Sequence, residues 1–191
     1  MYRVNFIKRF VLLILLLVVS INLSCVSIQV QRDMEYKLLK KHYKYMNKEA
    51  YKFIKWWSND RKIDIILTCS LIDYESGDCR KTKFNWEKMK RVHSRSNAIG
   101  VMQLLRKYHG GKNWRDLYDP NINIKRGTMY LKLCIMKSRR QGFKNVYAEA
   151  LRMYNSGMGA DRDDYPDYLW NNYVYRIMVK YEKVKNDMWN A

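Results

Sequence analysis

The sequence predicts a mainly helical protein with a single folded domain. Two observations carry this prediction: apolar residues recur at helical rather than alternating spacing in Ile63–Ile72, and Asp119-Pro120 forms a helix-start signal. A chain of 191 residues, less an N-terminal export segment, has room for one domain with a sizeable core. The sequence contains no internal repeat and no low-complexity linker, so a second domain is not expected.

Residues 1–31 have the pattern of an export signal or a hydrophobic membrane-anchor helix. Three basic residues precede the apolar run Phe10–Val19, and no charged residue follows until Arg32. The uncharged stretch is long enough to cross a bilayer, which takes about 20 residues. Because basic residues stay on the cytoplasmic side, the rest of the chain is expected in the cell envelope, in the periplasm or on the extracytoplasmic face of the membrane.

Cys25 is the candidate site of lipidation. The run Leu23-Ser24-Cys25 is similar to a lipoprotein signal box, in which the cysteine becomes the lipidated first residue of the mature chain. Asn22 departs from that pattern, which usually has an aliphatic residue at this place. A lipid anchor, an uncleaved signal anchor and simple secretion therefore stay open.

The composition is strongly basic, with 37 Lys and Arg against 18 Asp and Glu and a formal net charge of +19. Such a charge favours a polyanionic partner, and nucleic acid is the default for a cytosolic protein. Export and the lack of any nucleic-acid motif argue against that partner. The cysteines show no Cys-x-x-Cys pair and no metal-ligand spacing with the histidines, so neither a metal nor another cofactor is expected.

Residues 32–60 are predicted to form one amphipathic helix. Between Met34 and Trp57 the apolar residues fall on one stripe, with lysines opposite. This helix is expected to pack on the following domain; the alternative is a Lys-rich stalk beside an anionic membrane surface. Asn59 or Asp60 is expected to cap the next helix.

Glu75 is the candidate catalytic residue. It closes the helical segment Ile63–Ile72 at the rim of the core, where desolvation raises the pKa of a carboxyl group and lets it keep a proton near neutral pH. A solvated glutamate at a helix end is the plain alternative. Asp73 faces away from Glu75 on a helix and Asp119 begins a distant helix, so neither is a convincing second carboxylate, while Asp78 stays open.

The segments after Glu75 are expected to be a polar basic loop followed by helices. A helix or a tight turn entering one is predicted at Gly100–Tyr108, and the alternation before Gly100 is too poor to predict strands. Further helices are predicted from Asp119 to about Arg139, over Val146–Asn155, and from Pro166 through Tyr181.

Four motifs occur in order along the chain: Glu75-Ser76, Gly100–Gln103, Arg152–Gly157 and Tyr173-Val174. They resemble the Glu-Ser, Gly-Leu-Met-Gln, Ala-Tyr-Asn-Ala-Gly and late Tyr-Val motifs of the SLT domain of lytic transglycosylases, relatives of goose-type lysozyme. The resemblance covers about Ile63 to Tyr181. It implies a lysozyme-like catalytic domain, assigned to residues 61–185, which a small β-hairpin would suit.

The chain departs from the family pattern at several places. Arg152-Met153 replaces the usual small-residue lead into Tyr-Asn, and Asn97 stands where a glycine is common. Thr82–Arg91 is an apparent insertion. Three roles stay open for it: added positive charge, a lid over the groove, or a solvated loop. None of these departures removes a catalytic group.

The resemblance implies a peptidoglycan lytic transglycosylase. Such an enzyme cleaves the β-1,4 bond between N-acetylmuramic acid and N-acetylglucosamine and forms 1,6-anhydromuramyl ends, with one glutamate, here Glu75, as general acid and then base. The residues that the resemblance implies bind the glycan strand or orient Glu75 are Ser94 (with Ser96 as a competitor), Gln103, Tyr154, Asn155 and Tyr173. A muramidase on the same fold and a non-catalytic glycan-binding scaffold are the alternatives.

Overall fold

The computed structural model describes residues 20–21, 24, 26–76, 86–91, 94, 96–109 and 111–190. The chain divides into two compact units, residues 1–38 and residues 39–191. In the first unit the chain is helical from residue 26 onward, with exposed Val26, Ile28 and Val30. Most of the predicted anchor, and Cys25 with it, lies outside the described residues.

Within the described part of the chain, none of the helices combines the length and the apolar character needed to span a bilayer.

The single helix predicted over residues 32–60 is wrong, because the chain forms two helices there. The first ends at residue 42, and α2 (Lys48–Arg61) begins after a turn. The Asn47 side chain starts α2 by accepting the backbone N–H of Ala50 at 2.8 Å, which satisfies one of the free donors of the first turn.

The turn before α2 buries two tyrosines that a continuous helix would place differently. The Tyr43 hydroxyl shares a hydrogen bond with the Ser70 hydroxyl at 2.8 Å, and the Tyr45 hydroxyl donates to the Cys69 carbonyl at 2.9 Å. Both tyrosines are buried together with Met46. The burial of this apolar area compensates for the interrupted helix.

Helix α3 (Ile65–Glu75) runs through the centre of the second unit. Its residues from Ile66 to Ile72 are all buried, which is typical of a helix enclosed on every side. The cap is Asp64, whose carboxylate accepts the N–H of Ile66 at 2.8 Å, and not Asn59 or Asp60 as predicted. Those two residues belong to the last turn of α2, which continues beyond them.

A small hairpin follows the short helix α4 (Trp86–Lys90). Strands β1 (Ala98–Ile99) and β2 (Leu104–Leu105) pair antiparallel, with the turn Gly100–Gln103 between them and α5 (Arg106–His109) directly after. The small hairpin that would suit the resembled fold is therefore present, formed by strands that the alternation before Gly100 was too poor to predict. Of the apparent insertion Thr82–Arg91, residues 82–85 lie outside the described part.

The remaining chain is helical. A 3-10 helix, Gly111–Tyr118, leads into α6 (Pro120–Arg140), and α7 (Val146–Ser156) packs along α6. The last segment consists of α8 (Asp167–Leu169), a π-helical turn at Trp170–Val174, and α9 (Tyr175–Trp189).

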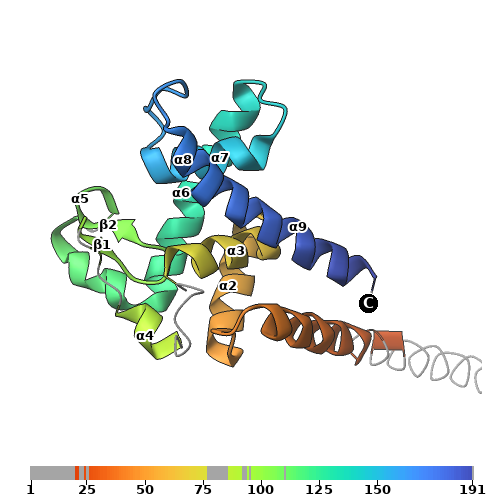
Figure 1. The fold of residues 1–191 in the computed structure, drawn as a ribbon. Coiled ribbons are helices and arrows are strands. Elements are labelled where there is room, and N and C mark those ends of the chain that lie inside the picture. The colour runs from red at the N-terminus through yellow and green to blue at the C-terminus, as the bar shows by residue number, and fades with distance from the viewer. Residues whose placement is uncertain are drawn as a thin grey trace, which may run out of the picture. The chain divides into compact units, whose positions relative to one another are not determined.

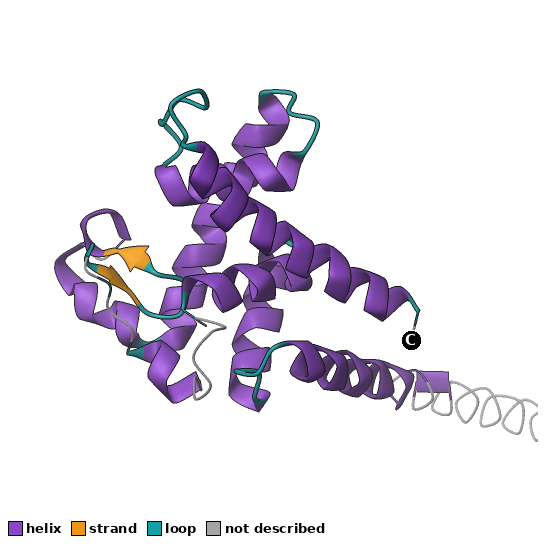
Figure 2. Ribbon diagram, in the orientation of Figure 1, coloured by secondary structure: helices purple, strands orange, loops and turns teal. Residues whose placement is uncertain are grey.

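Several sequence predictions are confirmed in these helices. The Asp119 carboxylate caps α6 by accepting the N–H groups of Asn121 and Ile122, with Pro120 at the first helical position. Helix α3 packs against α2 and α9, and α6 packs against α2 and α7 (Figure 1). Figure 2 shows the short strands beside a body of helices, so the mainly helical prediction is confirmed.

Candidate active site

Glu75 is the last residue of α3, and the residue after it fixes that end of the helix. Ser76 is buried, and its hydroxyl donates to the Val101 carbonyl in the hairpin turn at 2.8 Å. The end of α3 is thereby tied to the turn Gly100–Gln103. Glu75 is partly exposed as a residue, while its carboxyl group is desolvated by the side chains around it.

Burial raises the pKa of Glu75 from 4.5 to about 7. The Tyr173 hydroxyl donates to Glu75 Oε1 at 2.5 Å, which works in the opposite direction because this hydrogen bond favours the ionised carboxylate. The desolvation effect is larger, so the carboxyl group is about half protonated near neutral pH. The raised pKa expected from the position at the core's rim is therefore present.

Tyr173 comes from the π-helical turn Trp170–Val174. It lies 98 positions from Glu75 in the sequence, is only 3 % exposed, and packs edge-on against Tyr74 at 4.9 Å between ring centroids. A π-helical turn holds an extra residue and so changes which side chains face inward. The structure thus brings together Glu75 and the predicted site residue Tyr173.

Tyr154 makes a different contact from the one expected. Its hydroxyl donates to the Met102 carbonyl at 2.9 Å, whereas the family pattern led us to expect a contact with Glu75 or with the substrate. Tyr154 is buried, and burial first and then the charge of Glu75 raise its pKa, so the two side chains are close. Its direct role in this structure is to hold the hairpin turn.

Asn123 is a residue of the site that sequence reasoning missed. Its Oδ1 accepts the Met102 N–H, and its Nδ2 donates to the carbonyls of Ile99 and Leu117, each at 2.9 Å. A fully buried amide with all these partners determines the path of the turn. The available signal was a polar residue on the inward face of the first turn of α6.

Gly100 is required at the start of that turn. Its φ is +76°, and a Cβ atom there would lie 2.3 Å from Asn123 Nδ2 and 2.7 Å from the Leu117 carbonyl oxygen. A side chain would therefore be strained and would displace the Asn123 amide. This gives the glycine of the second motif a physical reason.

Gln103 and Ser94 bond to their own loops. Gln103 has a φ of +46°, and its Nε2 donates to the Gly100 carbonyl at 2.8 Å. The Ser94 hydroxyl accepts the Ala98 N–H at 3.1 Å and shares a hydrogen bond with the competing Ser96 at 2.8 Å. Both predicted residues therefore shape the hairpin, and their contacts with a substrate stay predictions.

Asn155 lies exposed at the end of α7 beside a second residue that sequence reasoning missed. The Tyr165 hydroxyl donates to Asn155 Oδ1 at 3.2 Å. Burial is the largest of the effects that raise the pKa of Tyr165 to about 12, and the charge of Glu75 contributes, so Tyr165 faces the same site. The sequence placed Tyr165 at the end of a polar turn, directly before Pro166, and gave no sign of its burial.

No second carboxylate acts on Glu75 within the described residues. Burial raises the pKa of Glu75, the Tyr173 hydrogen bond lowers it, and no carboxylate is among the causes of the shift. Asp73 lies 3.9 Å from the Lys180 ammonium group on α9, and Asp119 caps α6. Asp78 lies outside the described part. The described residues also include no cluster of His, Cys, Asp and Glu that could hold a metal ion.

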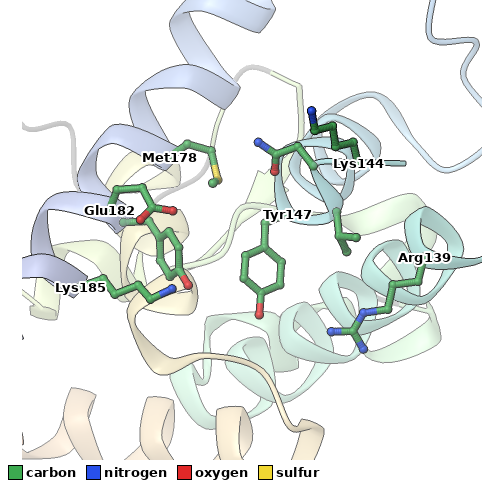
Figure 3. A pocket seen from close by; sticks show the side chains of 9 residues that line it. Arg139, Lys144, Tyr147, Met178, Glu182 and Lys185 are labelled. Carbon is green, nitrogen blue, oxygen red and sulfur yellow. The ribbon is translucent and has the colours of Figure 1, made fainter. Parts of the chain in front are cut away.

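A pocket of about 580 Å³ lies elsewhere on the second unit, between α6, α7 and α9 (Figure 3). The Arg139 guanidinium and the Lys185 ammonium reach into it from opposite walls, with Tyr147 between them. Its lining shares no residue with the contacts of Glu75 described above.

The comparisons with known proteins agree with this geometry. A family model, described as the transglycosylase SLT domain, matches residues 84–168. The match includes Ser94, Gln103, Tyr154 and Asn155, whereas Glu75 precedes it and Tyr173 follows it. The resemblance to an SLT domain that the motifs indicated is confirmed.

The chain also resembles a solved structure, an inactive glutamate-to-glutamine mutant of the lytic transglycosylase Slt from Pseudomonas aeruginosa. The TM-score is 0.51 at 17 % sequence identity, over 72 % of this chain and 24 % of that chain. This likeness establishes a mainly helical, lysozyme-like fold. The matched region makes up about a quarter of the length of the larger protein. The comparison with curated proteins returned no match.

Proposed function

We propose that the SLT domain of this chain is a peptidoglycan lytic transglycosylase with Glu75 as its acid–base residue. The observation that carries the proposal is the environment of Glu75, whose pKa of about 7 and hydrogen bond to Tyr173 prepare a proton donor at neutral pH. A general acid works best when its pKa lies near the working pH. The substrate class follows from the SLT family match and the lytic transglycosylase named among the solved structures.

In the first step, the protonated Glu75 donates to the glycosidic oxygen between N-acetylmuramic acid and N-acetylglucosamine. The bond from this oxygen to the anomeric carbon breaks, and the N-acetylglucosamine leaves with a free 4-hydroxyl group. The muramyl N-acetyl oxygen supports the positive charge that develops on the anomeric carbon.

In the second step, the Glu75 carboxylate accepts the proton of the muramyl 6-hydroxyl group, and that oxygen bonds to the anomeric carbon. The product is a 1,6-anhydromuramyl end, and Glu75 regains the proton with which it began. The Tyr173 hydrogen bond stabilises the carboxylate between the two steps, because it favours the ionised form.

The part of the chain that the structure describes, which excludes Asp78, holds no carboxylate partner for Glu75, and this favours a route that needs none. Most glycosidases use two carboxyl groups, one of which activates water or attacks the sugar. Among the described residues, no second carboxylate contributes to the pKa of Glu75. A substrate that supplies its own nucleophile needs no such group.

The proposal extends to the cell envelope as the place of action. Peptidoglycan lies outside the cytoplasm, which agrees with the export pattern of residues 1–31. The attachment of this segment to a membrane, by an apolar helix or by a lipid on Cys25, is part of the proposal. Ser94, Gln103, Tyr154 and Asn155 are proposed to border the glycan strand.

The test is to incubate the full chain, in detergent, with purified peptidoglycan and to identify the released muropeptides by mass. The wild type and Glu75→Gln are compared, with Glu182→Gln as the matched control because Glu182 is an exposed glutamate on α9. We expect anhydromuramyl products, each lighter than its hydrated counterpart by one water, from the wild type and the control but not from Glu75→Gln.

Other products would change the assignment. Reducing-end products would identify a muramidase and would require a group that positions water. Binding of glycan by a folded protein that releases no product would identify a non-catalytic scaffold.

A further inference from the structure

A buried ion cluster lies on α7, one turn before the Tyr154-Asn155 motif. Arg152 Nε donates to Glu149 Oε2 at 3.0 Å, and both side chains are only 4 % exposed. A buried charge is costly unless it is paired and its other polar atoms are satisfied. The remaining partners of these two side chains therefore indicate what the cluster does.

Those partners belong to the loop after α7. The guanidinium Nη1 of Arg152 donates to the carbonyls of Ala160 and Asp161, each at 3.4 Å. In return, Arg162 Nε from the same loop donates to Glu149 Oε1 at 2.9 Å. The cluster thus holds the loop at three points, with one arginine on the helix and one on the loop.

The loop comprises residues 157–166, and its first part is also held from α6, where the Lys137 ammonium group donates to the Met158 carbonyl. Its residues from Gly157 to Asp164 are exposed or partly exposed, and they include two glycines. Tyr165 is the one buried residue of this loop. Its ring lies 6.0 Å from the Arg152 guanidinium and packs edge-on against Trp170, the first residue of the π-helical turn. The position of Tyr165 therefore depends on the cluster.

We propose that Glu149, Arg152 and Arg162 act as a clamp that positions Tyr165 and Asn155 as a glycan-binding wall beside Glu75. The inference rests on the proposed function for the identity of the ligand. Tyr165 reaches Asn155 through a hydrogen bond of 3.2 Å, so a displaced loop separates the two polar groups. The clamp residues touch no substrate; they are positioning residues.

The shape of arginine explains the choice of residue at position 152. A guanidinium group presents several donors in a fixed plane and can serve a carboxylate and neighbouring carbonyls at once, which a single ammonium group cannot do with the same geometry.

The first measurement is the steady-state cleavage of soluble, uncrosslinked peptidoglycan strands by the full chain. Arg152→Lys keeps the charge and loses the fork, and Arg140→Lys, at an exposed position of α6, is the matched control. If the loop is correctly placed for only about a tenth of the time, KM rises roughly ten-fold while kcat changes little. The control and the pH dependence of activity are expected to stay as in the wild type.

A double-mutant cycle tests whether Arg152 acts through Tyr165. Tyr165→Phe removes the hydroxyl that binds Asn155 and is expected to raise KM as well. Residues that act through one another give non-additive effects, so Arg152→Lys combined with Tyr165→Phe should be no worse than the more severe single variant. Additive effects would overturn the clamp as a device acting on Tyr165.

A third measurement keeps the clamp testable if the proposed function fails. A protease that cleaves before aspartate has sites at Asp161, Asp163 and Asp164, and cleavage there should be faster in Arg152→Lys than in Arg140→Lys or the wild type. Arg162→Gln, on a side chain that is 58 % exposed, gives the same readout without emptying a buried position.

The outcomes separate the two proposals. Suppose that the wild type has no lytic activity but that the protease cleaves the loop faster in both clamp variants. The proposed function is then wrong and the clamp stands. If the protease cleaves the loop no faster in both variants than in the wild type, the clamp is overturned, whatever the lytic activity.

Discussion

Two parts of the site differ in how they are built. Glu75 ends α3, and Tyr173 stands on the π-helical turn that leads into α9, the helix that packs against α3; a hydrogen bond of 2.5 Å joins the two side chains directly. Ser94, Gln103 and Asn155 stand on a hairpin, its turn and a helix end, and each bonds to its own or a neighbouring loop. The position of Glu75, the proposed acid, is thus set by packing, whereas the residues proposed to border the glycan strand, here called the wall, are set by turns that local hydrogen bonds hold.

Changes at Glu75 and Tyr173 should therefore alter the chemistry itself, whereas changes at the wall should alter binding and stability.

Glu75→Gln should have the largest effect, because it removes the proton donor and keeps the shape of the side chain. General acid–base catalysis contributes roughly 10²–10⁴-fold, so we expect kcat to fall by about that factor. Asp73→Asn is the matched control, since Asp73 lies on the same helix but faces Lys180. A comparable loss in both variants would indicate damage to α3 instead of loss of an acid.

The same variant should be more stable than the wild type at high pH. The pKa of Glu75 is about 7 in the folded state against 4.5 ordinarily. The contribution of this carboxyl group to the free energy of unfolding is therefore fully present below pH 4.5 and is lost as the pH rises through 7. Glutamine does not ionise, so at about pH 9 Glu75→Gln should be roughly 3 kcal/mol more stable than the wild type, with no difference at about pH 4. Chemical denaturation at the two pH values measures this, and a constant difference would contradict the raised pKa.

Tyr173→Phe should slow the reaction and shift its pH dependence. The variant keeps the ring contact with Tyr74 but removes a charge-assisted hydrogen bond, which is worth about 1.5–3 kcal/mol, or roughly ten- to a hundred-fold in rate. Since that bond lowers the pKa of Glu75, its loss should move the alkaline limit of activity to higher pH. Tyr175→Phe, at an exposed tyrosine of α9, is the control. If the alkaline limit of activity stayed in place or moved to lower pH, the Tyr173 hydrogen bond would not be what lowers the pKa of Glu75.

The sequence predicts the acid better than the wall for a physical reason. The position of Glu75 follows from the helical spacing of Ile63–Ile72 and from the burial which that spacing requires. The Asp119 cap and the bounds of α6 and α7 likewise follow from local chemistry. These features depend on residues that are neighbours in the sequence.

The features that the sequence did not predict depend on distant partners. The break before α2 follows from the bonds of Tyr43 and Tyr45 to α3, and the turn after β1 follows from the amide of Asn123 on α6. The burial of Tyr165 follows from the cluster around Arg152. The spacing of apolar residues along the sequence does not indicate such contacts, because each contact joins residues from separate elements.

Tyr154→Phe should have the smallest effect, and it decides between the family expectation and the contact in this structure. The hydroxyl donates to the Met102 carbonyl and not to Glu75, so its loss leaves one buried carbonyl without this donor. We expect a loss of about 1 kcal/mol in the free energy of unfolding, measured by chemical denaturation. The alkaline limit of activity should stay where it is in the wild type, because the Tyr154 hydroxyl is not among the causes of the Glu75 pKa. A shift like that of Tyr173→Phe would mean that Tyr154 orients the acid directly, and the division between a packed acid and a hydrogen-bonded wall would then have to include Tyr154 on the side of the acid.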